Sequence, residues 1–272
     1  MIISILQAMT LVVHGNAFLS KDYDISSYYP DNKVFAFDDK VIFGELDNKT
    51  SQFLTIANGP IEWLKHLKKD GCRLLRLFYA SPEDDFAGNK RILAGMVGGG
   101  GDWWIETIFT DYSNQWFWKE DITHKEALDG KIWTITYFSS LKKMDPPEAD
   151  SDTFEVVEQN LKKALTNIKQ FSANQKLDNW IQIFERALMV LDGKEANSDE
   201  FNKCFPVEFC TEQFFQLAGS ADIAWVFGGM GSWNDLSFDK PEDQAEYDNL
   251  SDELYLSLVL SLVYVTNSAG IT

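Results

Sequence analysis

The first half of the chain carries short apolar runs separated by turn residues, a pattern typical of β-strands. The runs are rich in β-branched and aromatic residues, and Asp, Asn and Gly interrupt them. Runs of this length and composition favour successive antiparallel strands. We expect strands at residues 9–14, 33–39, 40–46, 52–58, 72–80, 90–98, 103–110, 114–120 and 131–139.

The N-terminal stretch "MIISILQAMTLVVHGNAFL" is predicted to enter the fold as a buried strand. It has neither the basic n-region nor the small-residue cleavage site that define a signal peptide. The longest later apolar run, residues 254–265, is shorter than the ~20 residues that span a bilayer. We therefore expect a cytoplasmic, soluble protein with no membrane association.

One segment of the first half changes to a helical period. Asn58 can cap a helix there, Pro60 suits its first turn, and an Asp-Gly pair ends it. Its apolar residues fall on one face, at Ile61, Leu64 and Leu67. An antiparallel sheet covered by one helix predicts an α+β fold for residues 1–145.

The second half, residues 146–272, has mostly helical periodicity. Helices are predicted at 153–171 and 177–191, and the first has apolar residues at steps of three and four. A shorter helix is expected from about Pro206, and Ser251 is expected to cap a last helix that is apolar almost all round. Between the halves, Lys142 to Asp152 contains two prolines and many charges, which indicates a linker.

Net charge is −18 and unevenly shared between the halves. Residues 1–145 hold 16 Lys and Arg against 20 Asp and Glu, whereas residues 146–272 hold 8 against 22. Because phosphate binding requires clustered Lys and Arg, nucleic acid is not expected as a partner. The imbalance favours a basic protein partner, although acidity can also serve solubility alone.

The densest acidic stretch is the predicted partner-binding surface. Its carboxylates are Asp235, Asp239, Glu242, Asp243, Glu246 and Asp248. Their spacing is irregular and Pro241 interrupts them, so they do not form the regular ligand pattern of a calcium loop. The three histidines and three cysteines also lack the spacing of a zinc site. No metal, cofactor or catalytic residue is assigned.

Tryptophans on neighbouring predicted strands form a second candidate surface. Trp116 and Trp118 should share one face, while Trp103 and Trp104 point to opposite faces. Aromatic side chains on an exposed face are typical anchors of a protein interface. We therefore expect Trp103, Trp116 and Trp118 to contribute to partner binding.

The stretch "GGMGSWND" is predicted to be a structural turn that docks Trp233 onto the fold. Gly228, Gly229 and Gly231 give its backbone the freedom that tight reversals need. Ser232 lacks the flanking glycines of a GxSxG nucleophile elbow. The other glycine cluster, residues 98–101, lacks the Lys and Ser/Thr of a phosphate loop and is expected to be a hairpin or bulge.

The C-terminal stretches "AWVFGGMGSWNDLSF" and "EYDNLSDELYLSLVLSLVYVTN" resemble the endings of small acidic bacterial proteins. Several of those proteins look like immunity proteins, which neutralise polymorphic toxins exchanged between competing bacteria. The resemblance covers residues 224–267 and implies a cytoplasmic inhibitor with a protein partner. It transfers no catalytic residue.

Three functions follow as hypotheses. The first is a toxin-neutralising inhibitor whose acidic surface occludes a basic toxin domain. The second is a hydrolase that reverses a toxin's modification with carboxylates such as Asp102 and Glu106. The third is a structural or regulatory subunit of a larger assembly.

Overall fold

The fold is α+β, as predicted, with one sheet and a mostly helical second half. The computed structural model describes residues 3–20, 23–47, 50, 52–80, 102–140, 144–147 and 152–270. Its six strands are β1 (Asp38–Asp47), β2 (Gln52–Asn58), β3 (Leu74–Ala80), β4 (Asp102–Ile108), β5 (Ser113–Ile122) and β6 (Trp133–Ser140). The predicted strand at 90–98 and the hairpin at 98–101 lie outside the described residues.

The strand order is β2-β1-β6-β5-β4-β3. Neighbouring strands pair antiparallel except β1 and β6, which pair parallel. Parallel strands cannot be joined by a tight hairpin, and here the whole of β2 to β5 separates the two in sequence. The sheet is therefore mixed, and its parallel pair, β1 and β6, is a long-range contact inside the sheet.

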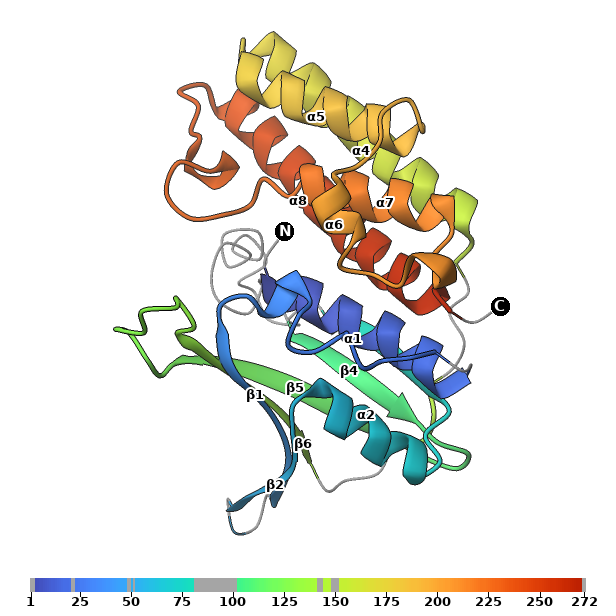
Figure 1. Cartoon of the computed structure of the whole chain (residues 1–272). Helices are drawn as coiled ribbons and strands as arrows, with labels where there is room; N and C mark the ends of the chain where they lie inside the picture. The colour runs from blue at the N-terminus through green and yellow to red at the C-terminus, as the bar shows by residue number, and fades with distance from the viewer. Residues whose placement is uncertain are drawn as a thin grey trace.

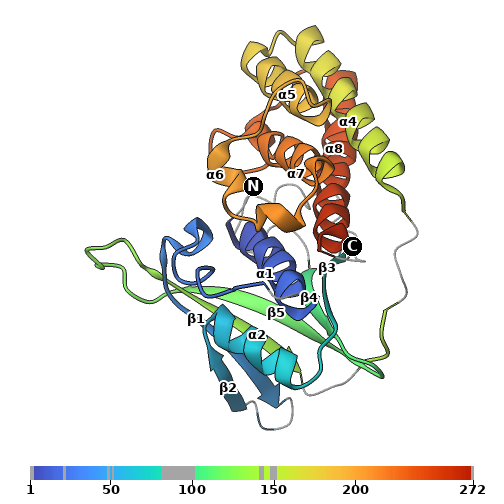
Figure 2. The ribbon, with the colours of Figure 1, turned by 45° about the vertical axis from the view of Figure 1, so that its right-hand side comes forward.

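The N-terminal stretch is a helix, α1 (Ile3–Ser20), which corrects the predicted strand at 9–14. Almost every residue from Ser4 to Ala17 is buried, because α1 lies between the sheet and α8 (Pro241–Ser268), as Figures 1 and 2 show. A continuous apolar run is compatible with a buried strand or a buried helix, and periodicity does not separate the two. Residues 33–35 form a 3-10 turn, η1 (Lys33–Phe35), instead of the start of a strand.

The predicted covering helix is α2 (Pro60–Lys69), with Pro60 in its first turn. Its N-cap residue is Gly59, at φ +107°, and not Asn58. Trp63 and Leu64 are fully buried against the sheet, and the Trp63 ring stacks on Phe43 of β1 with centroids 4.5 Å apart. Two helices thus cover this face, α1 and α2.

The second half begins with the two predicted helices, α4 (Phe154–Asn174) and α5 (Asp178–Leu191). The short helix α6 (Asp199–Asn202) and the 3-10 turn η3 (Val207–Phe209) precede α7 (Glu212–Ile223). Helix α7 starts later than the predicted Pro206, because the Thr211 side chain caps it by accepting from Phe214 N at 3.1 Å.

Helix α8 begins at Pro241, ten residues before the predicted cap Ser251. Ser251 lies fully buried inside the helix, where its hydroxyl donates to the Tyr247 carbonyl at 2.5 Å. Ser251 is therefore a packing residue and not a cap. The sequence contains two helix-start signals here. Ser-Asp-Glu from Ser251 is typical of an N-terminus, but Pro241 followed by Glu242 and Asp243 is equally typical, and the helix begins there.

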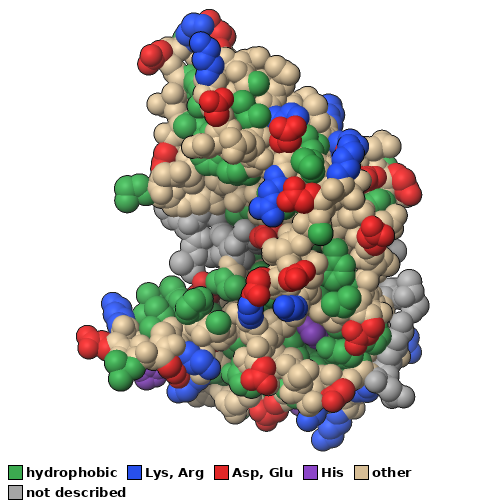
Figure 3. Space-filling model, turned by 45° about the horizontal axis from the view of Figure 1, so that its top comes forward, with side chains coloured by type: hydrophobic (Ala, Val, Ile, Leu, Met, Phe, Trp, Pro, Cys, Tyr) green, Lys and Arg blue, Asp and Glu red, His purple; other side chains and the backbone are tan. Residues whose placement is uncertain are grey.

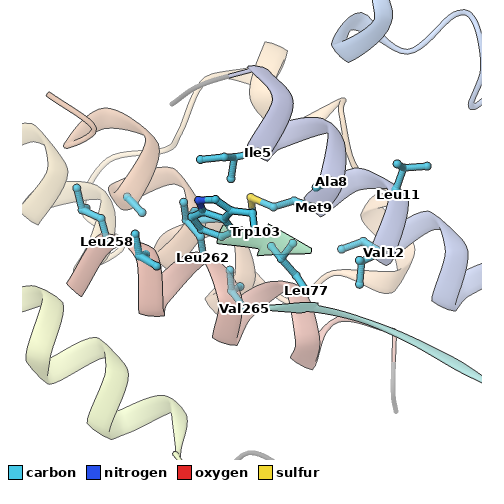
Figure 4. Close-up of a cluster of buried hydrophobic side chains, with 14 of the residues drawn as sticks. Ile5, Ala8, Met9, Leu11, Val12, Leu77, Trp103, Leu258, Leu262 and Val265 are labelled. Carbon is cyan, nitrogen blue, oxygen red and sulfur yellow. The ribbon is translucent and has the colours of Figure 1, made fainter. Parts of the chain in front are cut away.

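The core continues from the sheet through α1 into α8. Figure 4 shows Met9 and Val12 of α1 beside Leu77 and Trp103 of the sheet and Leu262 of α8. All of these side chains are buried. The predicted linker, residues 142–152, falls mostly outside the described residues, so the boundary between the halves stays a prediction.

Two asparagines cover the β3 edge of the sheet. Asn16 of α1 donates to the Leu75 carbonyl at 3.0 Å and accepts from Leu75 N–H at 2.8 Å. Asn267 of α8 donates to the Leu77 carbonyl at 2.9 Å and accepts from Leu77 N–H at 2.7 Å. Because each amide offers the donor and acceptor that a neighbouring strand would offer, this asparagine clamp satisfies the edge strand.

Candidate protein-binding surface

The glycine-rich turn at residues 228–231 is held by local hydrogen bonds. Ser232 Oγ donates to the Gly228 carbonyl at 3.0 Å, and Ser232 N–H donates to the Gly229 carbonyl at 3.1 Å. Gly231 has φ +85°, a conformation that L side chains rarely adopt, and its N–H donates to the Asp235 carboxylate. The Ser232 hydroxyl is thus engaged in hydrogen bonds within the turn.

Trp233 is fully buried, as expected for the residue that the turn docks. Its indole N–H donates to Ser251 Oγ at 2.7 Å, and its carbonyl accepts from the Tyr247 hydroxyl at 2.6 Å. The rings of Trp180 and Phe184 meet it edge-on, with centroids 5.3 and 5.4 Å away. The turn therefore fixes the start of the acidic stretch on α5 and α8.

The acidic residues after this turn lie on the surface at the N-terminal end of α8. Four of the six are exposed, Asp235, Asp239, Glu242 and Glu246, while Asp243 and Asp248 are half-buried. Asp239 precedes α8, and Glu242 lies in its first turn. A carboxylate at a helix N-terminus is stabilised by the helix dipole, so the acidity here also suits the local fold.

Two of these carboxylates contact neighbouring polar or charged side chains among the described residues. Lys240 lies 3.7 Å from the Asp243 carboxylate, and Gln244 donates to Asp248 at 3.2 Å. Lys240 is the only Lys or Arg after Lys203. The negative field of the exposed carboxylates therefore extends into solvent, screened only by salt.

The three tryptophans expected to anchor a partner divide between core and surface. Trp103 and Trp116 are buried, with 4% and 2% of their surface exposed, so neither side chain is accessible to a partner. Trp116 packs against Trp63, and its indole N–H donates to Thr107. Trp118 shares the helix-covered face with Trp116 but is half-buried, against Tyr137. The prediction that Trp103 and Trp116 contact a partner is wrong because α1 and α2 cover the face of the sheet to which both side chains point.

The face of the sheet that points away from α1 and α2 carries a row of rings across four strands. Phe78, Trp104, Phe117 and Phe138 are half-buried neighbours, with ring centroids 5.4 to 6.1 Å apart. At the β1–β2 end of this face a cavity of about 550 Å³ is lined by Ile42, Leu46, Phe53 and Phe138, among others. The tryptophans on neighbouring strands indicated an aromatic surface, but among them it is Trp104 that belongs to this row of rings.

The carboxylates of the hydrolase hypothesis lie on one face of β4 but apart. Asp102 is exposed, whereas Glu106 is buried and accepts from Ser113 Oγ at 3.0 Å. Burial raises the pKa of the Glu106 carboxyl, while the Ser113 hydrogen bond opposes the rise. Four strand positions separate their Cα atoms by about 13 Å.

Histidine and cysteine side chains show no catalytic grouping. His14 is buried and donates from Nε2 to the Cys204 carbonyl at 3.0 Å, so its Nδ1 accepts from the Tyr23 hydroxyl at 2.8 Å. Burial lowers the pKa of His14 to about 4 and raises the pKa of the Cys72 thiol to about 12. Within the described part of the chain, no three His, Cys, Asp or Glu side chains converge as a metal site.

A buried polar group that the sequence analysis did not single out lies at the start of α1. Ser4 and Gln7 of α1, Asp38 of β1 and Glu120 of β5 line a cavity of about 40 Å³, which we call the Asp38 pocket. Burial raises the pKa of Asp38 to about 7 and also raises the pKa of Glu120. These residues come from elements far apart in sequence, and no pattern within one element marks them.

The chain matches no protein-family model, no curated protein and no solved structure. By length and composition alone, α1 resembles a membrane-spanning helix, but 72% of it is buried inside the fold. A helix buried to this extent is equally typical of the core of a soluble protein.

Proposed function

We propose that this protein is a protein-binding inhibitor of the immunity type, which neutralises a basic partner such as a toxin domain by covering it with the acidic surface. The observation that carries the proposal is the group of exposed carboxylates around the start of α8, held in place by the buried Trp233. A rigid anchor beneath a charged surface keeps the charges in a fixed arrangement, which favours complementarity to one partner.

Two further observations support binding over catalysis. The Ser232 hydroxyl of the glycine-rich turn is held by hydrogen bonds within its own loop. Of the β4 carboxylates, Asp102 is exposed, whereas Glu106 is buried and bonded to Ser113. Four of the six carboxylates of the acidic surface are exposed, which suits attraction of a cationic surface over distances of about 10 Å at 0.1 M salt.

The test uses a variant in which Asp239, Glu242, Asp243 and Glu246 become Asn or Gln. Its partner is the protein encoded beside it or one captured by the tagged chain, and association is followed by biolayer interferometry across salt concentrations. We expect association to slow at least tenfold at low salt and its salt dependence to flatten, since steering acts mainly on the on-rate. The melting temperature should change little, because exposed carboxylates contribute little to stability.

A matched control removes four exposed carboxylates elsewhere, at Asp31, Asp111, Glu185 and Glu208. It reduces the net negative charge by the same four units, so any specific role of the acidic surface shows as a difference between the two variants. Equal association rates for both variants and the parent chain would refute this surface as the recognition site.

A further inference from the structure

The Asp38 pocket holds a buried hydrogen-bond acceptor that no described residue satisfies. Gln7 is 1% exposed, and its Nε2 donates to the Val34 carbonyl at 2.6 Å and to Asp38 Oδ2 at 2.7 Å. Both partners accept hydrogen bonds, so the amide nitrogen must face them and the amide orientation is fixed. Gln7 Oε1 is therefore a buried acceptor, and it has no partner.

Two other oxygens border the pocket, Ser4 Oγ and Glu120 Oε1. Ser4 is 1% exposed, and its hydroxyl acts as a hydrogen-bond donor to the Glu120 carboxyl, which lowers the pKa of Glu120 against the larger effect of burial. Gln7 Oε1 is thus the acceptor at this cavity that lacks a donor among the described residues. An unsatisfied buried acceptor costs about 1–3 kcal/mol, which indicates that a donor belongs there.

The charge around the pocket selects a cationic donor. Asp38 and Glu120 both bear carboxyl groups at the cavity, and the charge of Glu120 disfavours ionisation of Asp38. Lys131 is the base that acts on Asp38, yet it forms no ion pair with it in the described part of the chain. A cation in the cavity would satisfy the Gln7 Oε1 acceptor and compensate both carboxylates, as buried charges require.

The rim of the pocket is apolar, which favours a cation carried on an apolar stem over a bare ion. Ile3 and Phe37 line it with 45% and 62% of their surface exposed. Figure 3 shows hydrophobic side chains gathered along the arm formed by the β5–β6 hairpin, which carries Glu120 at its base. Exposed apolar groups around a charged floor match a side chain with an apolar stem and a charged end.

We propose that the Asp38 pocket receives the ammonium group of a lysine side chain from the basic partner, with the methylene stem packed against Ile3 and Phe37. This inference rests on the proposed function, because it assigns a specific anchor to the same partner. A cavity of about 40 Å³ exceeds the ~10–15 Å³ that one water needs, and so has room for a compact ammonium. A bare calcium ion would need six to eight oxygen ligands and would leave the apolar rim without a role.

The experiment needs no partner, so it separates failure of this pocket from failure of the acidic surface. The isotope-labelled chain is titrated with N-acetyl-lysine methylamide, and in parallel with the same probe acetylated on Nε. We expect the first probe to shift the Gln7 side-chain amide and the Ser4 backbone resonances, with a Kd in the ~mM range typical of a single anchored group. The acetylated probe should bind at least tenfold more weakly.

The variants Asp38→Asn and Glu120→Gln keep the shape of the pocket and remove its charge. Each variant should weaken binding of the lysine probe at least tenfold, and Phe37→Ser should weaken its binding severalfold. Asp121→Asn is the matched control, because Asp121 is exposed and neighbours Glu120 on the opposite face of β5. It should bind the probe as the parent chain does.

Three results would overturn the proposal. The first is no shift of the pocket resonances at about 20 mM probe, well above a mM-range Kd. The second is equal binding of the two probes, which would show that the pocket does not distinguish a charged lysine ammonium from its neutral acetylated form. The third is a calcium or magnesium chloride titration that shifts the pocket resonances where the lysine probe does not, which would make the pocket a metal site.

Discussion

Replacement of Asn267 by Ala tests whether the asparagine clamp holds the two halves together. Asn267 is 5% exposed, and its amide makes both hydrogen bonds to the backbone of Leu77, which is fully buried. Ala removes the donor and the acceptor at once. The Leu77 N–H and carbonyl are then left unpaired in a region from which α1 and α8 exclude water.

The magnitude follows from these two buried groups. Each unsatisfied backbone group costs about 1–3 kcal/mol, so the variant should lose about 2–5 kcal/mol of unfolding free energy. Domains of this kind are stable by ~5–15 kcal/mol in total, so the loss is a large fraction. Asn16→Ala removes the equivalent pair at Leu75 and should cost a similar amount.

Urea denaturation followed by tryptophan fluorescence and by circular dichroism measures the loss through the transition midpoint. Ser268→Ala is the matched control, because Ser268 is exposed and its hydroxyl bonds only within α8, to the Tyr264 carbonyl. It should stay within about 0.5 kcal/mol of the parent chain. A loss below about 1 kcal/mol for Asn267→Ala, with an unchanged slope, would refute the clamp as a stabilising element.

Three other predictions address the turn, the buried histidine and the linker. Trp233→Ala should cost about 3–5 kcal/mol of unfolding free energy. Met230→Ala, at a fully exposed position of the same turn, should leave the unfolding free energy unchanged in the same urea assay. Equal losses for the two variants would contradict the role of Trp233 in docking the turn onto the fold. The pKa of His14 falls from 6.5 unfolded to about 4 folded, so the unfolded state takes up the proton first and stability should drop by up to about 3 kcal/mol as the pH falls from 6.5 to 4. His14→Asn should lower stability at pH 7 but lose this pH dependence, and a parallel slope would disprove the assignment. Limited proteolysis followed by mass spectrometry should cut within residues 142–152 before 132–138, and earlier cleavage of 132–138 would show that the boundary is misplaced.

The elements that sequence predicted well are those whose signals are local. The alternation of residues 114–120 and the Pro60 start of α2 depend on neighbours in the chain, and both elements formed where expected. The start of α8 was misplaced because Pro241 and Ser251 both carry valid N-terminal signals. The choice between them is made by packing, since Ser251 is needed to accept the Trp233 indole N–H.

The elements that sequence did not predict depend on long-range contacts. Helix α1 was taken for a strand because its apolar residues face the sheet on one side and α8 on the other, which erases its periodicity. Burial of Trp103 and Trp116 depends on that same helix. The Asp38 pocket joins Gln7, Asp38 and Glu120 from three separate elements, and no pattern within one element marks it.

The asparagine clamp also has a consequence for the order in which the chain is made. The ribosome releases β3 long before Asn267, which lies 190 residues after Leu77. At ~5–20 residues per second, about 10 to 40 seconds pass before that amide exists. During this interval the Leu77 backbone groups lack the partner that α8 brings, and an unsatisfied sheet edge is a template for pairing with other chains. The outer edge of β3 at Leu77 is therefore open to pairing with other chains until α8 is synthesised.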